Sequence, residues 1–546
     1  MTARDLAAAV RSRGFTPSVR DVGVLVDLLA TADAEAEKDV ERALSRLGDG
    51  VLPELEARAR SAKSPLRGRL CRVIGRLAPE SEGARAFLLE ALADADAKTR
   101  RNAIVALGKV SASGVEDALL DAWEREDRVD HRRSLAASLG KIGGARALAK
   151  LRAANAHGAD DAELARIIGR ALLMLERTGS RGEESGIDAE RAPEIPTQVV
   201  LHCRAGIESI LASELAKKFD ARVTRPARVM ATLTGPMKEL FDARTMMSFG
   251  FPLPQQWLRD GEDAGDVLVR AMATPEAATI FRTWTRGAIR YRIAWGGGGH
   301  RRAVVWRAAQ RIGELDASLV NDPTESTWEV TVHQQRRFID VEVAPRALVD
   351  PRFLWRVGDV PAASHPTLAA AIARVAGVES DDVVWDPFVG SGSELVERAL
   401  AGPYARLIGT DIDPAAVEIA KKNLASAEVP AHKWSVEVGD ATTFTPPPPG
   451  GVTLIVSNPP MGRRVHRHTQ LGQLLDRMID RAAELLVPGG RMVWLSPIGE
   501  RTKQRALAAG LRVEFAQDVD MGGFFAQLQR LRKPELRRGP SRPDRL

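Results

Sequence analysis

The chain has 546 residues, of which 44% are hydrophobic and 27% charged, and its formal net charge is +6. This length exceeds a single hydrophobic core and indicates about three to four globular domains, while no apolar run approaches the roughly 18 residues that cross a bilayer. Spread over this length, the positive charge is too small to indicate a polyanionic partner by itself.

Export and metal binding are also disfavoured. Residues 1–5 carry charge where a signal peptide needs its apolar segment, so we expect a cytoplasmic protein without a membrane partner. The two cysteines, Cys71 and Cys203, are too few for a disulfide framework or a thiolate zinc site. His466 and His468 lie in a basic loop suited to phosphate, and without a paired cysteine or acid we expect no metal there.

The first 178 residues are internally repetitive. An aliphatic residue followed by glycine closes a helical pattern about every thirty residues, as in Leu47-Gly48, Ile74-Gly75, Leu107-Gly108, Leu139-Gly140 and Ile168-Gly169. A pair of short helices that cannot bury its apolar face alone must stack on copies of itself. The sequence therefore predicts an α-solenoid over 1–178, similar to HEAT repeats, with a surface for a protein or RNA partner. A helical bundle without repeats is the alternative.

The segment 179–196 is rich in Gly, Ser, Glu and Pro and has no period, so it predicts a linker. Strand and helix patterns then alternate through two α+β modules, 197–265 and 266–355. In the second module arginines alternate with aromatic residues, which favours an RNA-binding surface, although the aromatic residues could equally belong to the core. The set comprises arginines 282, 286, 290, 292, 301, 302 and 307 with Trp284, Tyr291, Trp295 and Trp306.

The region 356–532 predicts a doubly wound α/β sheet. Apolar strands are expected at Val383, Leu407, Trp434, Val452 and Arg491, with helices between them and an antiparallel hairpin at the end. The basic tail 533–546 is rich in Pro and Arg and is expected to be disordered.

Two motifs at predicted strand ends indicate a cofactor site. Asp386 ends the first strand and a glycine-rich turn opens a helix near Ser393, while Asp411 ends the second strand. This layout suits an adenosine-bearing cofactor, with an acid placed for the ribose hydroxyls. The turn lacks the third glycine of a dinucleotide site and the Lys-Ser or Lys-Thr of a phosphate loop.

A third motif, Asn458-Pro459-Pro460-Met461, follows the predicted strand 452–457. In this order the three motifs resemble the S-adenosylmethionine-dependent amino-methyltransferases, and among them the RNA guanine-N2 methyltransferases that carry a THUMP domain. The resemblance covers 196–532. It implies a ferredoxin-like module at 197–265, a THUMP-like module at 266–355, a class I methyltransferase domain with a Rossmann-like sheet at 356–532, and tRNA or ribosomal RNA as substrate.

The resemblance also places the cofactor. The turn would lie against its methionine part, Asp411 would accept the ribose hydroxyls, Ile412 would pack on the adenine and Asp440 would accept the adenine amine. Helix capping is the alternative for Asp411, although Asp413 before Pro414 is the better cap. The expected cofactor residues are Thr367, Asp386, Pro387, Gly390, Gly392, Asp411, Ile412, Asp440, Ala441 and Asn458.

Asn458 and Pro459 are the expected catalytic residues. A ring-conjugated amine is a poor nucleophile, and its lone pair turns toward the methyl group if the Asn458 side-chain oxygen and the Pro459 carbonyl accept its hydrogens. Pro460, Met461 and Phe524 are the expected substrate residues. Met461 stands where the family has an aromatic ring, so Phe524 or Phe525 would have to supply the stacking face.

Two other functions are open. Protein glutamine methyltransferases also use an Asn-Pro-Pro motif, and loss of turnover through Met461 would leave an RNA-binding scaffold that keeps its cofactor pocket. Loss of methyl transfer after ribonuclease treatment supports RNA as the substrate, and persistence supports a protein. Any methyl transfer to RNA excludes the non-catalytic scaffold.

Overall fold

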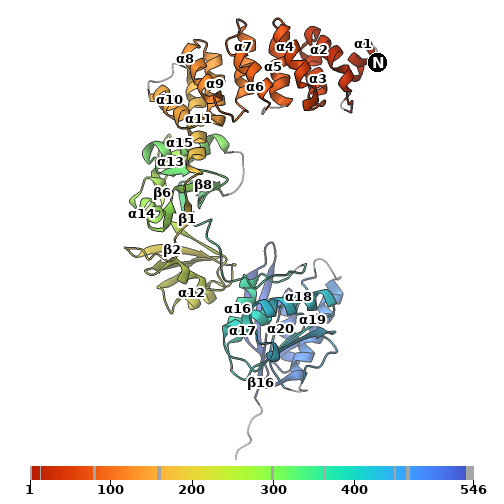
Figure 1. Ribbon diagram of the computed structural model, residues 1–546. Helices are drawn as coiled ribbons and strands as arrows, with labels where there is room; N and C mark the ends of the chain where they lie inside the picture. Colours follow the sequence, from red (N-terminus) through yellow and green to blue (C-terminus); the bar gives the residue numbers. More distant parts are fainter. Residues whose placement is uncertain are drawn as a thin grey trace, which may run out of the picture. The chain divides into compact units, whose positions relative to one another are not determined.

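A computed structural model of the protein describes residues 3–12, 14–77, 81–156, 161–296, 301–361, 363–447, 451–462 and 468–535 (Figure 1). The chain divides into two compact units. The first comprises Met1–Gly186, Gln255–Ala278 and Thr285–Asp340, and the second comprises Ile187–Pro254, Thr279–Trp284 and Val341–Leu546. Within the described residues, no helix has the length and apolar character that would let it span a membrane. Of the expected disordered tail, residues 536–546 lie outside the described part.

The N-terminal region is a stack of helices, drawn from red to orange in Figure 1. Helix α5 packs on α7, α7 on α9 and α9 on α11, and one continuous apolar core runs through the stack. The helices are α1 (Ala3–Ala9), α2 (Val22–Thr31), α3 (Ala34–Ser45), α4 (Leu52–Ser61), α5 (Leu66–Leu77), α6 (Glu82–Ala91), α7 (Ala97–Leu107), α8 (Val115–Arg125), α9 (Val129–Ile142), α10 (Ala145–Ala156) and α11 (Ala162–Ser180). The predicted solenoid is confirmed.

Three of the five repeated glycines, Gly75, Gly108 and Gly140, lie where one repeat meets the next. A Cβ atom on Gly75 would stand 2.4 Å from the Cβ of Ala106, and one on Gly140 would stand 2.6 Å from the Cβ of Ala171. Real carbon atoms do not approach this closely, so only glycine permits the observed spacing between these helices. At these three positions the glycine therefore permits the contact between successive repeats, whereas a Cβ on Gly48 would meet nothing within 4 Å and one on Gly169 would meet Gln310.

The last solenoid helix also packs on the α/β part of the first unit. Helix α11 contacts α15 and β9, and Arg181 forms an ion pair with the fully buried Asp322, with 3.0 Å between Nε and Oδ2. Strands β10, β8 and β9 are adjacent and parallel. The elements are α13 (Ala264–Met272), β6 (Gln256–Trp257), β8 (Ile289–Trp295), α15 (Arg302–Leu315), β9 (Leu319–Asn321) and β10 (Trp328–Gln334).

The segment 179–196, predicted as a linker, contains secondary structure. Strand β1 (Ser185–Ile187) pairs with β7 (Thr285–Gly287). The Ser185 hydroxyl donates to the carbonyl of Ala288, with 2.6 Å between the oxygens. A short strand of Ser, Gly and Ile carries no recognisable period, and for this reason the sequence did not predict it.

The predicted surface of arginine and aromatic residues is buried in part. Trp284 and Tyr291 are fully buried, and Arg290 is 6% exposed and donates to backbone carbonyls, among them Glu183 at 2.5 Å. The guanidinium groups of Arg170 and Arg177 lie over the Trp306 ring at 5.2 and 5.9 Å from its centroid. Of the predicted set only Trp284, Tyr291 and Arg290 are buried, whereas the arginines at 282, 286, 302 and 307 are exposed, and their contact with RNA remains a prediction.

The second unit begins with an antiparallel sheet in the order β3-β4-β2-β5, on which helix α12 packs. Val343 of β11 continues the sheet by pairing with Phe251 of β5. This mixed arrangement fits the α+β module that the sequence predicted. Its elements are β2 (Thr197–His202), α12 (Glu208–Leu215), β3 (Ala221–Arg225), β4 (Arg228–Leu233), β5 (Ser248–Pro252), α14 (Pro275–Trp284) and β11 (Phe338–Ala344).

The rest of the second unit is a seven-stranded sheet in the order β14-β13-β12-β15-β16-β18-β17, drawn from cyan to blue in Figure 1. Five neighbouring strands are parallel, and β18 runs antiparallel to both of its neighbours. The strands are β12 (Val383–Asp386), β13 (Arg406–Asp411), β14 (Trp434–Val438), β15 (Val452–Ser457), β16 (Leu486–Ser496), β17 (Arg512–Asp520) and β18 (Phe525–Arg532).

The helices of this sheet are α16 (Pro366–Ala376), α17 (Ser393–Ala401), α18 (Pro414–Ser426), α19 (His468–Leu485) and α20 (Gly499–Ala508). The predicted doubly wound fold with its final hairpin is confirmed. The chain moves outward from β12 through β13 to β14 and then returns to β15 on the other side of β12. In such sheets ligands bind at the carboxyl edge beside this switch point.

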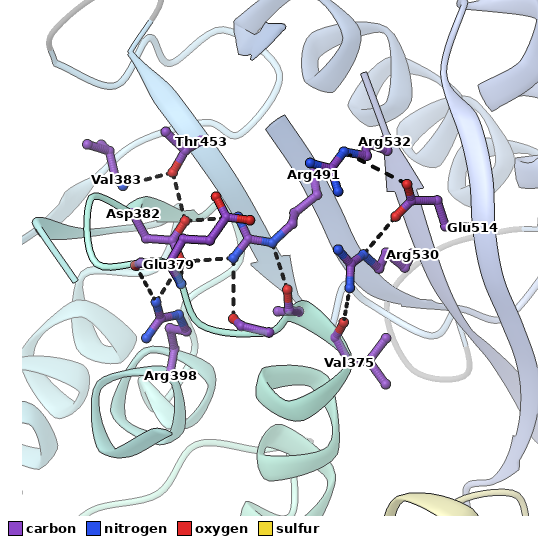
Figure 2. A network of polar contacts seen from close by, with 12 residues as sticks. Val375, Glu379, Asp382, Val383, Arg398, Thr453, Arg491, Glu514, Arg530 and Arg532 are labelled. Carbon is purple, nitrogen blue, oxygen red and sulfur yellow. Dashed lines mark hydrogen bonds and ion pairs between the residues drawn. The ribbon is translucent and has the colours of Figure 1, made fainter. Parts of the chain in front are cut away.

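A buried ionic cluster joins the amino ends of the central strands (Figure 2). Asp382 accepts hydrogen bonds from Arg491 through both carboxylate oxygens at 2.9 Å and from Arg398 at 2.6 Å. All three side chains are at most 1% exposed. Burial raises the pKa of Asp382, but the hydrogen bonds from the two arginines outweigh burial and hold it below its ordinary value. This cluster fixes the sheet at the end opposite to the carboxyl edge.

Candidate active site

The glycine-rich turn follows β12 and leads into α17. Gly390 and Gly392 have φ angles of +49° and +81°, in the left-handed region that favours glycine. A Cβ on Gly392 would also stand 3.2 Å from the Cβ of Ala420. At Gly390 a Cβ would meet nothing closer than 3.8 Å, so the backbone is open there to a ligand.

Asp411 at the end of β13 is tied to this turn. Its carboxylate accepts hydrogen bonds from the backbone N–H of Gly390 and of Asp413, each at 3.0 Å. Asp413 caps helix α18 by accepting from the N–H of Ala415 at 2.9 Å. Asp411 is therefore not the cap of α18, which removes the alternative role considered for it.

Apolar surface lies beside Asp411. Ile412 is 72% exposed, and Val438 at the end of the neighbouring strand β14 is 54% exposed. Leaving two aliphatic side chains uncovered at one edge of a sheet suits a flat apolar ligand group such as an adenine ring.

Asp440 and Ala441 follow β14. The Asp440 carboxylate accepts from the backbone N–H and the hydroxyl of Thr442, at 2.8 and 2.7 Å, and the first of these hydrogen bonds makes the largest contribution to lowering the pKa of Asp440. Ala441 is 3% exposed. The structure thus shows a local turn at Asp440, and its contact with the adenine amine remains a prediction.

Asp386 is fully buried at the end of β12. Its Oδ1 accepts from the Ser457 hydroxyl at 2.8 Å and from the backbone N–H of Phe388 at 3.1 Å, whereas its Oδ2 has no hydrogen-bond partner within the described residues. Burial, followed by the charge of Glu394, raises the pKa of Asp386 well above its ordinary value. A buried acceptor of this kind is a place for a ligand donor, such as the ammonium group of a methionine moiety.

Thr367, expected near the cofactor, lies in the first turn of α16 and is fully buried. The ring of His365, which caps this helix, is 2.8 Å from the Thr367 hydroxyl oxygen through Nδ1. Burial lowers the pKa of His365, and neighbouring arginines lower it further. Thr367 therefore serves the helix start, and a role toward the cofactor remains a prediction. Pro387 is buried within the turn.

Asn458 directly follows β15, so it lies at the same edge as Asp386 and Asp411. Its amide nitrogen donates to the hydroxyl of Ser364 at 2.7 Å, and its Oδ1 is buried with no hydrogen-bond partner among the residues that the structure describes. The amide orientation follows from this hydrogen bond. Pro459 is buried, while Pro460 and Met461 are half-buried. The structure therefore presents a free acceptor at the position from which the sequence predicted one.

Phe524 and Phe525 lie at the turn between β17 and β18. Phe525 is 64% exposed, and β18 runs antiparallel to β16, so it begins at the edge where the parallel strands end. Both rings therefore lie on the edge that carries the site, and their contact with a substrate remains a prediction. The basic loop with His466 lies outside the described residues, as does the His468 side chain. The described residues contain no cluster of His, Cys, Asp and Glu that would hold a metal ion.

Sequence reasoning missed Ser364 and Glu394. The Ser364 hydroxyl donates to the Glu394 carboxylate, and both residues are buried, at 7% and 4% exposed. Glu394 directly follows the Gly-rich turn and Ser393, at a position where the sequence alone suggested only a helix start. The sequence offers no separate signal for Glu394, since the same helix also buries Glu397 and Arg398.

A doubly wound sheet with a glycine-rich turn after its first strand and a carboxylate after its second defines the class I methyltransferase fold, whose cofactor is S-adenosylmethionine. Residues 354–524 match the RMKL-like methyltransferase domain, and residues 85–172 match HEAT repeats. The exposed Gly390 backbone, the free Asp386 oxygen and the apolar surface at Ile412 fit this cofactor.

Several curated proteins are similar to the chain. A tRNA (guanine(6)-N2)-methyltransferase of Thermus thermophilus is 31% identical over 31% of this chain and 49% of its own length. One of the same description from Archaeoglobus fulgidus is 26% identical over 41% of this chain and 62% of its own. A tRNA1(Val) (adenine(37)-N6)-methyltransferase of Porphyromonas gingivalis is 32% identical over 23% of this chain and 54% of its own length. The chain thus spans about half to three fifths of the length of these relatives.

Proposed function

We propose that the chain is an S-adenosylmethionine-dependent methyltransferase that acts on the exocyclic N2 amine of guanine in tRNA or ribosomal RNA. The observation that carries this proposal is the buried, unpaired Oδ1 of Asn458 beside the cofactor turn. The names of the two guanine-N2 relatives support the choice of base, and the adenine-N6 relative shares the exocyclic amine. RNA is the proposed partner and the cytoplasm the proposed location.

The mechanism requires positioning more than acid-base chemistry. The cofactor supplies a methyl group bonded to a positively charged sulfur, which departs neutral. Asn458 Oδ1 accepts one hydrogen of the target amine and the Pro459 carbonyl accepts the other, which directs the nitrogen lone pair toward the methyl carbon. The target nitrogen would gain the methyl group from the sulfur and would release one proton to solvent water.

The central experiment measures tritium transfer from labelled cofactor to total RNA of a strain that lacks the gene, followed by nucleoside mass spectrometry. N2-methylguanosine is the expected product. N6-methyladenosine would correct the base. Label that resists ribonuclease but is lost on proteolysis would support methylation of a protein glutamine, and no transfer at all would support a non-catalytic scaffold.

Asp411→Ala should weaken cofactor binding. Loss of hydrogen bonds to a charged acceptor costs on the order of 1.5–3 kcal/mol, which corresponds to about one to two decades in affinity. Calorimetric titration with S-adenosylhomocysteine measures the effect. The exposed Glu418, which pairs with Lys421 on α18, provides a matched control, and Glu418→Gln should bind as the unmodified protein does. Equal affinity of a folded Asp411→Ala variant would remove Asp411 from the site.

Met461→Tyr should lower the KM for RNA by about one to two decades, since stacking on a base contributes about 1–3 kcal/mol and each 1.4 kcal/mol is tenfold. Met461→Leu keeps the apolar volume without a flat face and should leave the KM unchanged. Steady-state kinetics with the RNA identified above measure both variants. Loss of activity in the tyrosine variant alone would indicate that the acceptor is not a flipped base.

A further inference from the structure

Asn458 is held by a chain of two hydrogen bonds, the first partly buried and the second buried. Its amide nitrogen donates to Ser364 Oγ at 2.7 Å, and the Ser364 hydroxyl donates in turn to a carboxylate oxygen of Glu394. The three residues come from the end of β15, from the segment before α16 and from the first turn of α17. The sequence separations are 94 residues between Ser364 and Asn458 and 30 between Ser364 and Glu394.

The direction of this chain determines which atom of the amide faces the reaction. A serine hydroxyl has one hydrogen to donate. When Glu394 is ionised it can only accept, so Ser364 must give its hydrogen to Glu394 and use a lone pair for Asn458. That lone pair needs the NH2 group of the amide, and Oδ1 is left unpaired.

We propose that Glu394 and Ser364 are positioning residues, which orient the Asn458 amide so that its oxygen, and not its nitrogen, meets the target amine. This inference rests on the proposed function of Asn458. A protonated Glu394 would instead donate to Ser364 and free the serine hydrogen for Asn458. The amide would then turn, and its NH2 group would oppose the hydrogens of the substrate.

Several charged groups act on Glu394. Burial is the main reason that the pKa of Glu394 is raised to about 7; the charge of Glu397 on the same helix acts with burial, while the hydrogen bond from Ser364 and the charge of Arg356 act against it. Asp386 at the end of β12 is buried in the same region. The charges of Glu394 and Asp411 both raise the pKa of Asp386. His365, next to Ser364, is a further neighbouring titratable group, and burial lowers its pKa.

The sign of the pH effect follows from these directions. Methyl transfer should increase as the pH rises through about 7, because ionised Glu394 selects the productive amide orientation. In Glu394→Gln this rising limb of the pH–rate profile should disappear. The kcat should fall about tenfold, the factor that one hydrogen bond contributes, while the affinity for the cofactor stays within a few-fold. Ser364→Ala should lower kcat similarly, since it breaks the chain at its centre.

A matched control is Glu397→Gln, which removes a buried carboxylate one turn along α17 that pairs with Arg244 and not with Ser364. The rate of methyl transfer by Glu397→Gln should still rise with pH. A limb that persists in Glu394→Gln would overturn the proposal, because it would then belong to His365 or to another group.

A second measurement does not depend on activity. The chain has five asparagines, Asn102, Asn155, Asn321, Asn423 and Asn458, so 15N-asparagine labelling gives few side-chain signals, and Asn458→Ala identifies the one required. The Asn458 side-chain signal should shift between pH 6 and 8 in the full-length protein and stay constant in Glu394→Gln. This pH range extends about one unit to either side of the pKa of Glu394. A constant signal in the unmodified protein would overturn the positioning role. If the signal shifts but RNA receives no methyl group, the proposed function fails and the positioning role stands.

Discussion

Asn458→Ala should lose methyl transfer by roughly two to three orders of magnitude, the effect of removing one preorganised polar group from a reacting centre. The structure gives the reason. The Oδ1 atom is already desolvated and has no competing donor within the described residues, so it does not have to break a hydrogen bond before it accepts the amine. Single-turnover kinetics with saturating RNA measure this loss without interference from product release.

The same variant should keep its cofactor affinity within a few-fold. Asp386 and Asp411 retain their own backbone partners, Phe388 and Gly390, which do not depend on Asn458. Calorimetry on the variant provides this control. An Asn458→Ala enzyme that methylates RNA at the unmodified rate would refute the amine-orienting mechanism even though the fold is confirmed.

The motifs that sequence reasoning identified are those whose chemistry is local. The turn from Asp386 to Gly392 requires left-handed backbone at two glycines within a few residues, and such a local requirement can be recognised in the sequence. The solenoid glycines Gly75 and Gly140 can be recognised for a similar reason, since the contact between helices requires the same small residue at the same place in three successive repeats.

The parts that the sequence did not predict depend on contacts between distant residues. Nothing near Ser364 indicates that its hydroxyl joins Glu394 to Asn458, because the three residues come together only when β15, α16 and α17 pack. The sequence also does not show which of its residues are buried. Trp284 and Tyr291 lie in an arginine-rich stretch that resembles a nucleic-acid surface, and only the sheet shows that both face the core.

The ionic cluster of Figure 2 should be essential for the stability of the sheet domain. Asp382 is the acceptor that Arg398 and Arg491 share, and both guanidinium groups are buried. Asp382→Asn would leave Arg398 without its carboxylate partner, and Arg491 with only the half-exposed Glu379, 3.4 Å away. Removing one partner of a buried ion pair costs about 3–5 kcal/mol. We therefore expect a larger loss of stability here than at any exposed ion pair of the domain.

The pH dependence of this contribution follows from the lowered pKa of Asp382. Because the unfolded state binds its proton more readily, the stabilisation is complete above the ordinary value of 3.8 and is lost as the pH falls through the lower value of the folded state. Asp382→Asn should remove this acid dependence along with the stability.

Hydrogen exchange of the full-length protein measures the loss in the sheet alone, which is preferable to a single unfolding curve for a chain of several domains. Amides of β12, β15 and β16 should exchange about two to three and a half decades faster in Asp382→Asn, as a 1.4 kcal/mol loss is tenfold. The control is Glu514→Gln. Glu514 pairs with Arg530 at 2.9 Å, but their side chains are 34% and 25% exposed, and such pairs contribute about 0–1 kcal/mol. Equal exchange in the two variants would mean that the arginines find enough compensation in the carbonyls of Ala376, Gly402 and Pro403, to which they also donate.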